Sequence, residues 1–354
     1  MTETASDTSS CAPSGDGGMI PLDAARLGEV ASLPGAFGQP PLRGALRLTP
    51  DDFVVEEQLG FEPDGDGQHR LIHLQKRELN TAEVADALAR VAEVARNAVG
   101  YGGRQERRPP TSPWVSVDLA GREEPSWATE LAALFGDRVK LLTVAPHRRK
   151  LRIGTLTGNR FQIRVRQVSG DRAAAEARWA RLLTEGVPNY FGPQRFGEQG
   201  NNVRQALAWF ASGRLARRSM RDLLLSAARS ALYNQLLAER VREGTWNRAE
   251  PGDVLQLDGR GSWFIFGDDE DPGGIARRVA QGDLHPTGAL WGKDAPPTAG
   301  RIGALEVGVA AAYPELAAGL LRCGLSQDRR ALRVIPRDGA MDWTQDDIVL
   351  SFTL

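Results

Sequence analysis

The sequence predicts a mixed α/β (α+β) protein of two domains, on three observations. A chain of 354 residues is long for one hydrophobic core and short for three. Apolar residues make up 41% of it and charged residues 25%, as in an ordinary globular protein. Strand-type and helix-type patterns both recur along the chain, so we expect sheets and helices together.

Charge and cysteine content narrow the function classes. The formal net charge is −1, so a nucleic-acid surface has to come from local clusters of cations. Cys11 and Cys323 are too few for a disulfide framework or a four-ligand zinc site, and we expect a reducing, cytoplasmic location. Residues 1–40 are expected to be a disordered tail without the apolar stretch of a signal peptide, and no segment reaches membrane-spanning length.

The first half of the chain carries alternating strand and helix signals. Residues 45–57 and 69–76 have strand patterns. A helix is expected from Asn80, whose capping box is completed by Glu83, to Gly100. Its buried stripe would be Val84, Leu88, Val91 and Val94.

Residues 151–168 predict a hairpin that turns near Gly158 and Asn159. Its second arm alternates apolar residues with Gln162, Arg164 and Arg166, which gives one apolar and one cationic face. The stretch directly before it, residues 147–152, is the densest basic stretch of the chain. We therefore expect polyanion contacts in this region.

The second half of the sequence begins with a helix over about 171–185 and a turn-rich stretch from Gly186, where a second, inserted domain is expected to start. A long helix follows from Ser219 to Arg242, with Leu223, Ala227, Leu232 and Leu236 as its packed face. Another helix near 303–322 and strands in 331–336 and 347–354 complete the expected elements.

Few kinds of active site fit this sequence. His69 and His73 lie four apart on strand-type sequence, share no helix face and have no Cys or Glu partner near them, so no metal site is expected. P-loop, dinucleotide-binding and GxSxG signatures are absent from the sequence. The kind of active site that is left acts on a polyanion without a cofactor, through a carboxylate group in a loop.

Several signatures, in order, resemble those of the TruD family of tRNA pseudouridine synthases. They are DFVVEEQLGF with GDGQH (52–69), VGYGG (99–103), GNRF (158–161), PNYFGPQRFG (188–197), LLSAARSALYNQLLAER (224–240), HPTGALWG (285–292) and LSF (350–352). The resemblance covers the chain from about Ala45 onward. A coincidental match to a protein unconnected with RNA is the remote alternative.

The resemblance implies an architecture and a reaction. Residues 41–187 and 337–354 would form a pseudouridine-synthase catalytic domain with a mixed, mostly antiparallel sheet, and residues 188–336 a TruD-specific insertion domain. The family isomerises uridine 13 of certain tRNAs without a cofactor, and the target base has to leave its stack. We therefore expect tRNA as the partner, no membrane or protein partner, and a monomer.

The resemblance also assigns site residues. Phe53 and Phe352 would be pocket aromatics, Asn159 a polar contact to the flipped nucleotide, and Phe161 follows Asn159 in the same signature. Aromatic faces stack on an extruded base, and an amide both donates to and accepts from the edge of uracil. The plainer alternative is that Phe53 and Phe352 are strand core residues.

Phosphate contacts are expected from four cations: Arg148, Arg149, Lys150 and Arg195. Their alternative is a solvated charged face.

The catalytic loop departs from the family pattern. Glu106 stands where the family has its nucleophilic aspartate, Gln105 where it has a lysine, and Pro113 where it has a glutamine. The extra methylene of Glu106 displaces its carboxylate, and a misplacement of about 1 Å can cost about a hundredfold in rate. Two functions stay open: a uridine isomerase that uses Glu106, and a catalytically weak or inactive tRNA-binding protein.

Overall fold

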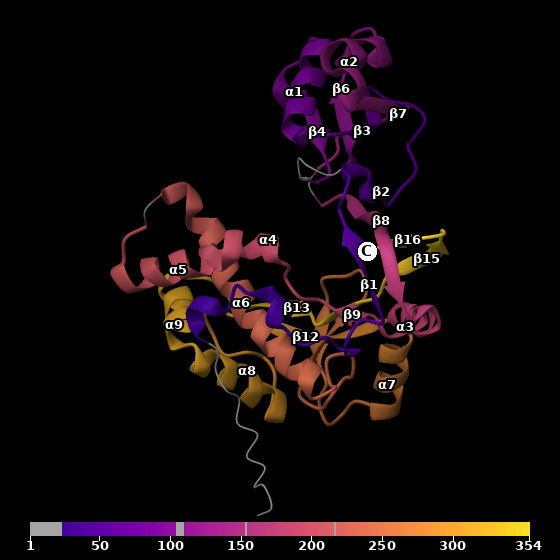
Figure 1. Cartoon of the computed structure of the whole chain (residues 1–354). Coiled ribbons are helices and arrows are strands. Elements are labelled where there is room, and N and C mark those ends of the chain that lie inside the picture. Colours follow the sequence, from indigo (N-terminus) through magenta and orange to yellow (C-terminus); the bar gives the residue numbers. More distant parts are fainter. Residues whose placement is uncertain (1–22, 104–109, 153, 216) are drawn as a thin grey trace, which may run out of the picture.

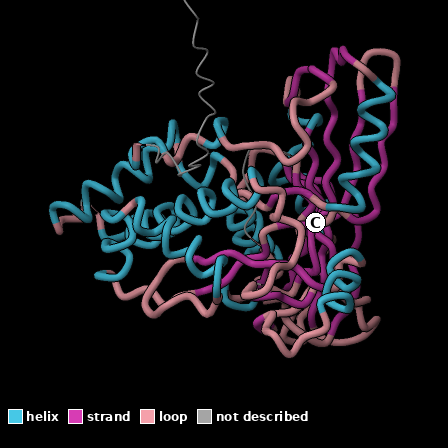
Figure 2. Tube along the Cα trace, turned by 90° about the horizontal axis from the view of Figure 1, so that it is seen from below, coloured by secondary structure: helices cyan, strands magenta, loops and turns pink. Residues whose placement is uncertain are grey.

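The computed structural model of this chain describes residues 23–103, 110–152, 154–215 and 217–354. Strands dominate one side of the molecule and helices the other (Figure 1, Figure 2). Gln105 and Glu106 lie outside the described residues.

The described part of the chain contains one sheet of ten strands, in the order β15, β16, β8, β2, β5, β3, β6, β4, with β1 paired to β8 and β7 to β3. The strands are β1 (Leu42–Leu46), β2 (Phe53–Leu59), β3 (His69–Lys76), β4 (Val99–Tyr101), β5 (Thr111–Ser112), β6 (Trp114–Asp118), β7 (Val139–His147), β8 (Leu156–Gly170), β15 (Arg337–Trp343) and β16 (Ile348–Thr353). β2 and β5 pair in parallel, and the other pairs are antiparallel. The mixed, mostly antiparallel sheet that the sequence predicts is confirmed.

Two helices cover the β3, β4, β6 and β7 end of this sheet: α1 (Thr81–Val91) and α2 (Trp127–Phe135) (Figure 1). The side chains of Ile72 and Leu74 on β3 are fully buried against Val84 and Leu88 of α1. Burying such aliphatic side chains stabilises the fold by about 1.5–3 kcal/mol each. This core holds β4, which ends at Tyr101, and β6, which begins at Trp114.

Helix α1 begins as the sequence predicts and ends earlier. The backbone N–H of Asn80 donates to the Glu83 carboxylate at 2.6 Å, which confirms the capping box. The expected end at Gly100 is wrong, because α1 ends at Val91 and Glu93 adopts a left-handed conformation (φ 53°). Residues 99–101 then extend as β4, since pairing with β6 satisfies their backbone groups.

The expected turn at Gly158 and Asn159 is wrong. β8 runs through both residues as one strand of fifteen residues. The backbone of Asn159 pairs with Glu57 of β2 on one side and exchanges two hydrogen bonds with Leu354 on the other, at 2.7 and 2.9 Å. These long-range pairings satisfy an extended backbone, so the local turn tendency of Gly-Asn does not decide the conformation.

Residues 189–332 form the helical part of the molecule. Its helices are α4 (Pro193–Phe196), α5 (Asn201–Ser212), α6 (Arg221–Arg242), α7 (Pro272–Ala280), α8 (Gly300–Ala312) and α9 (Pro314–Arg322). Its strands β10 (Val254–Leu257), β11 (Trp263–Ile265), β12 (Leu284–Leu290) and β13 (Asp328–Ala331) form a sheet in the order β11, β10, β12, β13.

Helix α6 is the centre of the helical part. Ala227, Leu232 and Leu236 are buried in its core, as the sequence predicts. Leu223 is instead 44% exposed, and its assignment to the packed face is wrong. It stands in the first turn of α6, where neighbouring helices do not cover every side of the helix.

The helix expected near 303–322 is two helices, α8 and α9, bent by 95° at their junction. Pro314 opens α9, because proline fits the first turn of a helix and interrupts one that it follows. Among the described residues, no single helix is long and apolar enough to cross a membrane, although this bent pair passes by length and composition.

Two of the crossings of the chain between the large sheet and the helical part adjoin each other. After α3 (Arg172–Glu185) it leaves through β9 (Val187–Pro188), and it returns through β14 (Arg333–Val334), which pairs with β9. Gly186 has φ 84°, and a Cβ on it would lie 2.8 Å from the Val334 carbonyl oxygen. Glycine is therefore required where the two crossings touch.

Candidate nucleic-acid site

Three phenylalanines form an aromatic cluster on one face of the large sheet. In the register of the sheet, Val55 of β2 and Phe352 of β16 both stand opposite Phe161 of β8. Residues directly opposite share a face, and so do residues two apart on a strand, which places Phe53 with them. The rings of Phe161 and Phe352 stack at 5.5 Å, and those of Phe53 and Phe161 meet edge-on at 6.2 Å. The structure thus brings together three residues that lie far apart in the sequence.

The remaining predicted pocket residue, Asn159, joins this cluster. It stands two residues before Phe161 and directly opposite Glu57. Its backbone is held on both sides, whereas its side-chain amide has no hydrogen-bond partner among the described residues. An amide held in place with open donors and acceptors is available to a ligand.

Two neighbours of the aromatic cluster were not expected. The guanidinium carbon of Arg47 lies 4.5 Å from the centre of the Phe53 ring, and Arg47 is exposed. Trp179 of α3 meets Phe352 edge-on at 6.1 Å and closes the other end of the cluster. The cluster therefore has a cation at its Phe53 end and an aromatic wall at its Phe352 end.

A buried carboxyl group lies between Gly103 and Trp114, the described residues on either side of the predicted catalytic segment. Glu57 is 1% exposed; its Oε2 accepts a hydrogen bond from the Trp114 backbone N–H at 2.9 Å. Its Oε1 has no hydrogen-bond partner among the described residues and lies 2.9 Å from where a Cβ on Gly103 would stand. This one carboxyl group is therefore packed against residues on both sides of that segment.

The electrostatics at Glu57 are those of a desolvated acid. Burial raises its pKa to about 7, against opposing effects of the Trp114 hydrogen bond and the charge of Lys76. Lys76 is fully buried and donates to the Leu79 carbonyl oxygen at 2.9 Å. Burial lowers the pKa of Lys76 to about 8, while Glu57 raises it. Perturbed groups of this kind gather at functional sites.

The basic stretch before β8 is partly occupied by intramolecular partners. Arg148 forms a bidentate ion pair with Asp66, with N···O distances of 2.7 and 2.8 Å. Lys150 donates to the Asn97 carbonyl oxygen. Arg149 is exposed and has no recorded partner among the described residues. Of the three predicted phosphate contacts here, Arg149 is the one with an open guanidinium.

Arg195 lies elsewhere, on α4 in the helical part. Its guanidinium donates to Ser226 of α6 at 2.5 Å and lies 5.1 Å from the Phe191 ring centre. The four predicted phosphate contacts are therefore divided between the two parts of the molecule.

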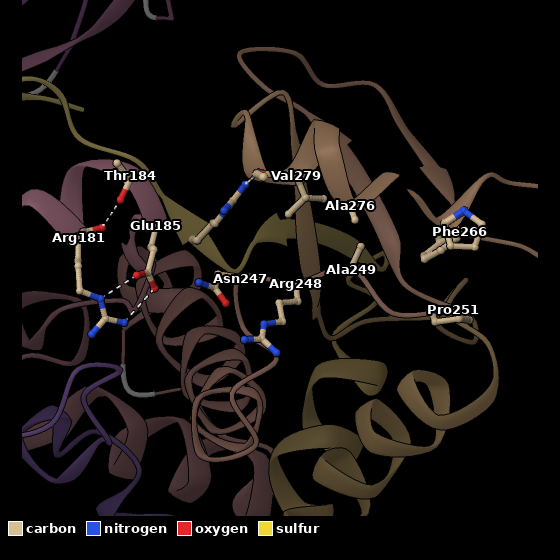
Figure 3. Close-up of a pocket in the computed structure, with 13 residues that line it drawn as sticks. Arg181, Thr184, Glu185, Asn247, Arg248, Ala249, Pro251, Phe266, Ala276 and Val279 are labelled. Carbon is tan, nitrogen blue, oxygen red and sulfur yellow. Dashed lines mark hydrogen bonds and ion pairs between the residues drawn. The ribbon is translucent and has the colours of Figure 1, made fainter. Parts of the chain in front are cut away.

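A cavity of about 720 Å³ shares no lining residue with the aromatic cluster. It separates the end of α3 from α7 and the segment around Arg248, and Arg181 and Glu185 of α3 pair across one wall (Figure 3). Arg333 of β14 also lines this cavity. Its guanidinium donates hydrogen bonds to the Leu284 carbonyl oxygen and to Nδ1 of His285. None of the predicted site residues lines this cavity.

Metal ligation finds no support in the described residues, which contain no group of three His, Cys, Asp or Glu side chains placed to hold an ion. His69 and His73 lie on β3, and the ring of His73 stacks on Trp114 at 4.4 Å.

Sequence reasoning missed Arg47, Trp179, Glu57 and Lys76 as parts of this neighbourhood. Glu57 and Lys76 each lie inside a strand pattern, where a charged residue normally faces solvent. A signal was available for Lys76, because alternation places it on the same face of β3 as the buried Leu74.

The fold and the site together define a class of protein. A mostly antiparallel sheet that carries stacked rings, an open amide and the exposed Arg47 at one place has the features of an α/β protein that binds nucleic-acid bases. Comparison with known proteins identifies the family within this class.

The chain belongs to the tRNA pseudouridine synthase D (TruD) family, whose model matches residues 36–208 and 198–354. It is 45% identical to the tRNA pseudouridine synthase D of Methylococcus capsulatus over 304 residues, which are 85% of this chain and 84% of that protein. It is 42% identical to that of Nitrosococcus oceani, over 90% of this chain and 88% of the relative. The family that the signatures predict is confirmed, and its members are isomerases.

The fold is shared with a solved structure. The crystal structure of the putative tRNA pseudouridine synthase D from Methanosarcina mazei superposes with a TM-score of 0.68 over 92% of this chain and 93% of that chain, at 20% identity. The fold class predicted from the sequence is thereby confirmed.

Proposed function

We propose that this chain isomerises uridine 13 of tRNA to pseudouridine, slowly, with Glu106 as the catalytic carboxylate. The observation that carries the proposal is the convergence of the Phe53, Phe161 and Phe352 rings with Asn159 at one place on the sheet. Glu57 connects this place to the loop, because it pairs with Asn159 and packs against both Gly103 and Trp114.

The aromatic cluster and Asn159 would hold the extruded uridine. Stacking on an aromatic side chain contributes about 1–3 kcal/mol per base, which offsets the cost of taking the base out of its stack. The amide of Asn159 can accept from uracil N3–H and donate to a carbonyl oxygen. Arg47, which lies over Phe53, is placed to meet the phosphate next to the base.

The reaction rearranges bonds within one nucleotide. The C1′–N1 bond breaks, the uracil turns, a C1′–C5 bond forms, and the proton on C5 is lost while N1 gains one. Glu106 would act on the ribosyl carbon during this exchange, as the family's aspartate does. Its longer side chain and the neutral Gln105 in the lysine position are the reasons for slow turnover.

The two parts of the molecule have different roles in this proposal. We propose residues 41–187 and 337–354 as the catalytic domain and residues 188–336 as the insertion domain, with tRNA bound between them. The crossing at β9 and β14 lies at these boundaries. The protein would act as a cytoplasmic monomer.

The second candidate is a tRNA-binding protein that has lost turnover. It is favoured by the loop sequence itself, in which Pro109, Pro110 and Pro113 accompany the changes at Gln105 and Glu106. Prolines restrict the backbone that has to present the carboxylate.

Pseudouridine mapping of a tRNA transcript incubated with the purified protein tests the proposal. We expect pseudouridine at position 13 and at no other uridine, at a rate well below the usual enzyme range of about 1–10³ s⁻¹. Glu106→Gln should abolish it, and Gln105→Lys with Glu106→Asp should accelerate it. Conversion by the unmodified protein within the usual range would contradict slow turnover.

The second candidate has a separate outcome. Retained tRNA binding without pseudouridine, even when Pro109→Ala and Pro113→Gln are added to the restored pair, would establish the binding protein and overturn the isomerase. Glu62→Gln, at an exposed position outside the site, serves as the folded control.

A further inference from the structure

A second cavity, of about 370 Å³, lies in the helical part between α4, α6 and the end of β12. Its lining is rich in cations and hydroxyl groups, with Arg195, Arg221, Arg229, Ser226 and Ser230 among its members. Leu225, Leu290 and Leu325 supply apolar walls, and Phe191 lies at one side. The cavity is remote in sequence from Phe53 and shares no residue with the aromatic cluster.

Two arginines of the lining, Arg195 and Arg229, contact no carboxylate among the described residues, and neither does Arg330 beside Phe191. By contrast, Arg240 and Arg329 of the helical part each contact a carboxylate at 2.8 Å. Arg195, Arg229 and Arg330 contact neutral oxygens instead. They donate to Ser226 Oγ at 2.5 Å, to the Leu290 and Ser326 carbonyl oxygens at 2.9 and 2.7 Å, and to Asn189 Oδ1 at 2.7 Å, respectively. Within the described residues, no carboxylate lies at ion-pair distance from these three guanidinium groups.

Phe191 holds two of these guanidinium groups in place. The guanidinium carbon of Arg330 lies 4.2 Å from its ring centre and that of Arg195 lies 5.1 Å away. The backbone of Phe191 is fixed in turn by the buried Asn234, which accepts from its N–H at 2.9 Å and donates to its carbonyl oxygen at 3.0 Å. A guanidinium that lies over a ring keeps its in-plane N–H donors free for an anion.

The remaining charges near the cavity strengthen this reading. Burial lowers the pKa of Arg229, which shows that its charge is partly desolvated, while Asp328 raises it. Asp222, the acid in the lining, lies 3.6 Å from Arg221, and its side chain is 96% exposed. Arg214, Arg217 and Arg218 continue the cationic surface along the chain before α6, and all three are exposed.

We propose that this cavity binds backbone phosphates of the tRNA, at a point on the RNA away from the isomerised uridine. The arrangement fits phosphodiesters, because guanidinium groups bind phosphate through paired N–H donors and the cationic surface extends beyond one anion. The inference rests on the proposed tRNA substrate. It gives the helical part a role of its own, which is to hold the RNA while the sheet holds the base.

The test removes two exposed cations of the cavity, Arg195→Gln with Arg221→Gln. The control, Arg242→Gln with Arg277→Gln, removes the same charge from exposed arginines whose contacts are Glu239 and Asp271. Equilibrium binding of a full-length tRNA transcript is measured for the parent and both variants across a salt series. We expect the Kd of the cavity variant to rise about tenfold and its salt slope to fall by about 2, with the control unchanged.

Binding and turnover readouts separate this inference from the proposed function. A protein that makes no pseudouridine still tests the cavity through the Kd and the salt slope. Where turnover is measurable, KM for tRNA should rise with kcat unchanged. Equal losses in the cavity and control variants would overturn the proposal, and so would an unchanged Kd.

A competition experiment tests whether tRNA occupies the cavity. Inorganic phosphate is added as a competitor at constant ionic strength, so that charge screening does not change. We expect displacement of tRNA from the parent and less displacement from the cavity variant, because free phosphate and RNA phosphates compete for the same guanidinium groups. Equal displacement from both proteins would show that tRNA does not occupy the cavity and would overturn the assignment to RNA.

Discussion

A buried ion pair in the helical part and a buried acid in the large sheet differ in how completely they are hydrogen-bonded. Arg240 and Asp253, in the helical part, meet through two hydrogen bonds of 2.8 and 3.0 Å, and Arg240 also donates to the Thr245 carbonyl oxygen. Glu57, beside the catalytic loop, receives one hydrogen bond and keeps an oxygen without a partner. The charge of Lys76 lowers the pKa of Glu57 and so opposes the effect of burial.

The difference separates groups that serve the fold from groups poised for function. A buried charge whose bonds are nearly complete is fixed, and losing its partner costs stability. Burial makes an acid such as Glu57 keep its proton up to near-neutral pH, where it titrates, and such perturbed groups accompany active sites. The same contrast recurs between Asn234 and Asn159, and between Arg148 and Arg149.

The largest expected effect is at the buried Arg240–Asp253 ion pair. Asp253→Asn leaves Arg240 charged and buried, so the free energy of unfolding should fall by about 3–5 kcal/mol. Urea denaturation measures this change in the free energy of unfolding. Asp222→Asn, at a side chain that is 96% exposed, is the matched control and should change stability by less than about 0.5 kcal/mol. A small loss of stability in Asp253→Asn would show that the Arg240–Asp253 pair does not stabilise the fold.

Glu57→Gln should show a stability difference that depends on pH. The pKa of Glu57 rises from 4.5 to about 7 on folding, so the parent loses stability as pH rises through this window. Glutamine stays neutral throughout. The stability of the variant relative to the parent should therefore increase by about 3 kcal/mol between pH 4 and pH 8.

Denaturation at several pH values checks this expectation. Glu62→Gln, at an exposed position, is the matched control. A difference between Glu57→Gln and the parent that is the same at every pH would show that the Glu57 carboxyl group does not titrate in this range.

The two asparagines sharpen the comparison for neutral groups. Asn234→Ala breaks both bonds to the Phe191 backbone and should lower stability by about 1–3 kcal/mol. Asn159→Ala should leave stability within about 0.5 kcal/mol and lower kcat/KM for tRNA roughly tenfold, since an open amide contributes to the ligand and little to the fold. Comparable losses of stability in both variants would show that Asn159 is a structural residue.

The smallest effect is expected on the exposed basic stretch. Arg149→Gln should reduce the salt slope of tRNA binding by about 1, as the loss of one phosphate contact does. Arg148→Gln should reduce it less, because its guanidinium is already paired with Asp66. Binding titrations over a salt series measure both, and a larger effect at Arg148 would reverse the order that the ion pair predicts.

Local signals in the sequence determined several elements. The capping box at Asn80, the helix after Asp171 and most of the buried face of α6 follow from residues three or four apart, so they could be read without the fold. The family signatures added Phe53, Asn159, Phe161 and Phe352, which the structure places together.

Long-range pairing decided the rest. The turn predicted at Gly158 and Asn159 is absent from the described β8, which continues through both residues because β2 and β16 pair with it on its two sides. The position of Arg47 over Phe53 depends on how distant strands pack. The contact of Glu57 with Gly103 and Trp114 likewise joins segments about 50 residues apart, which no local pattern encodes. The sequence by itself determined several helices and the family, whereas only the tertiary structure decided which charges are buried and which stay open to a ligand, because burial is a property of the packed molecule.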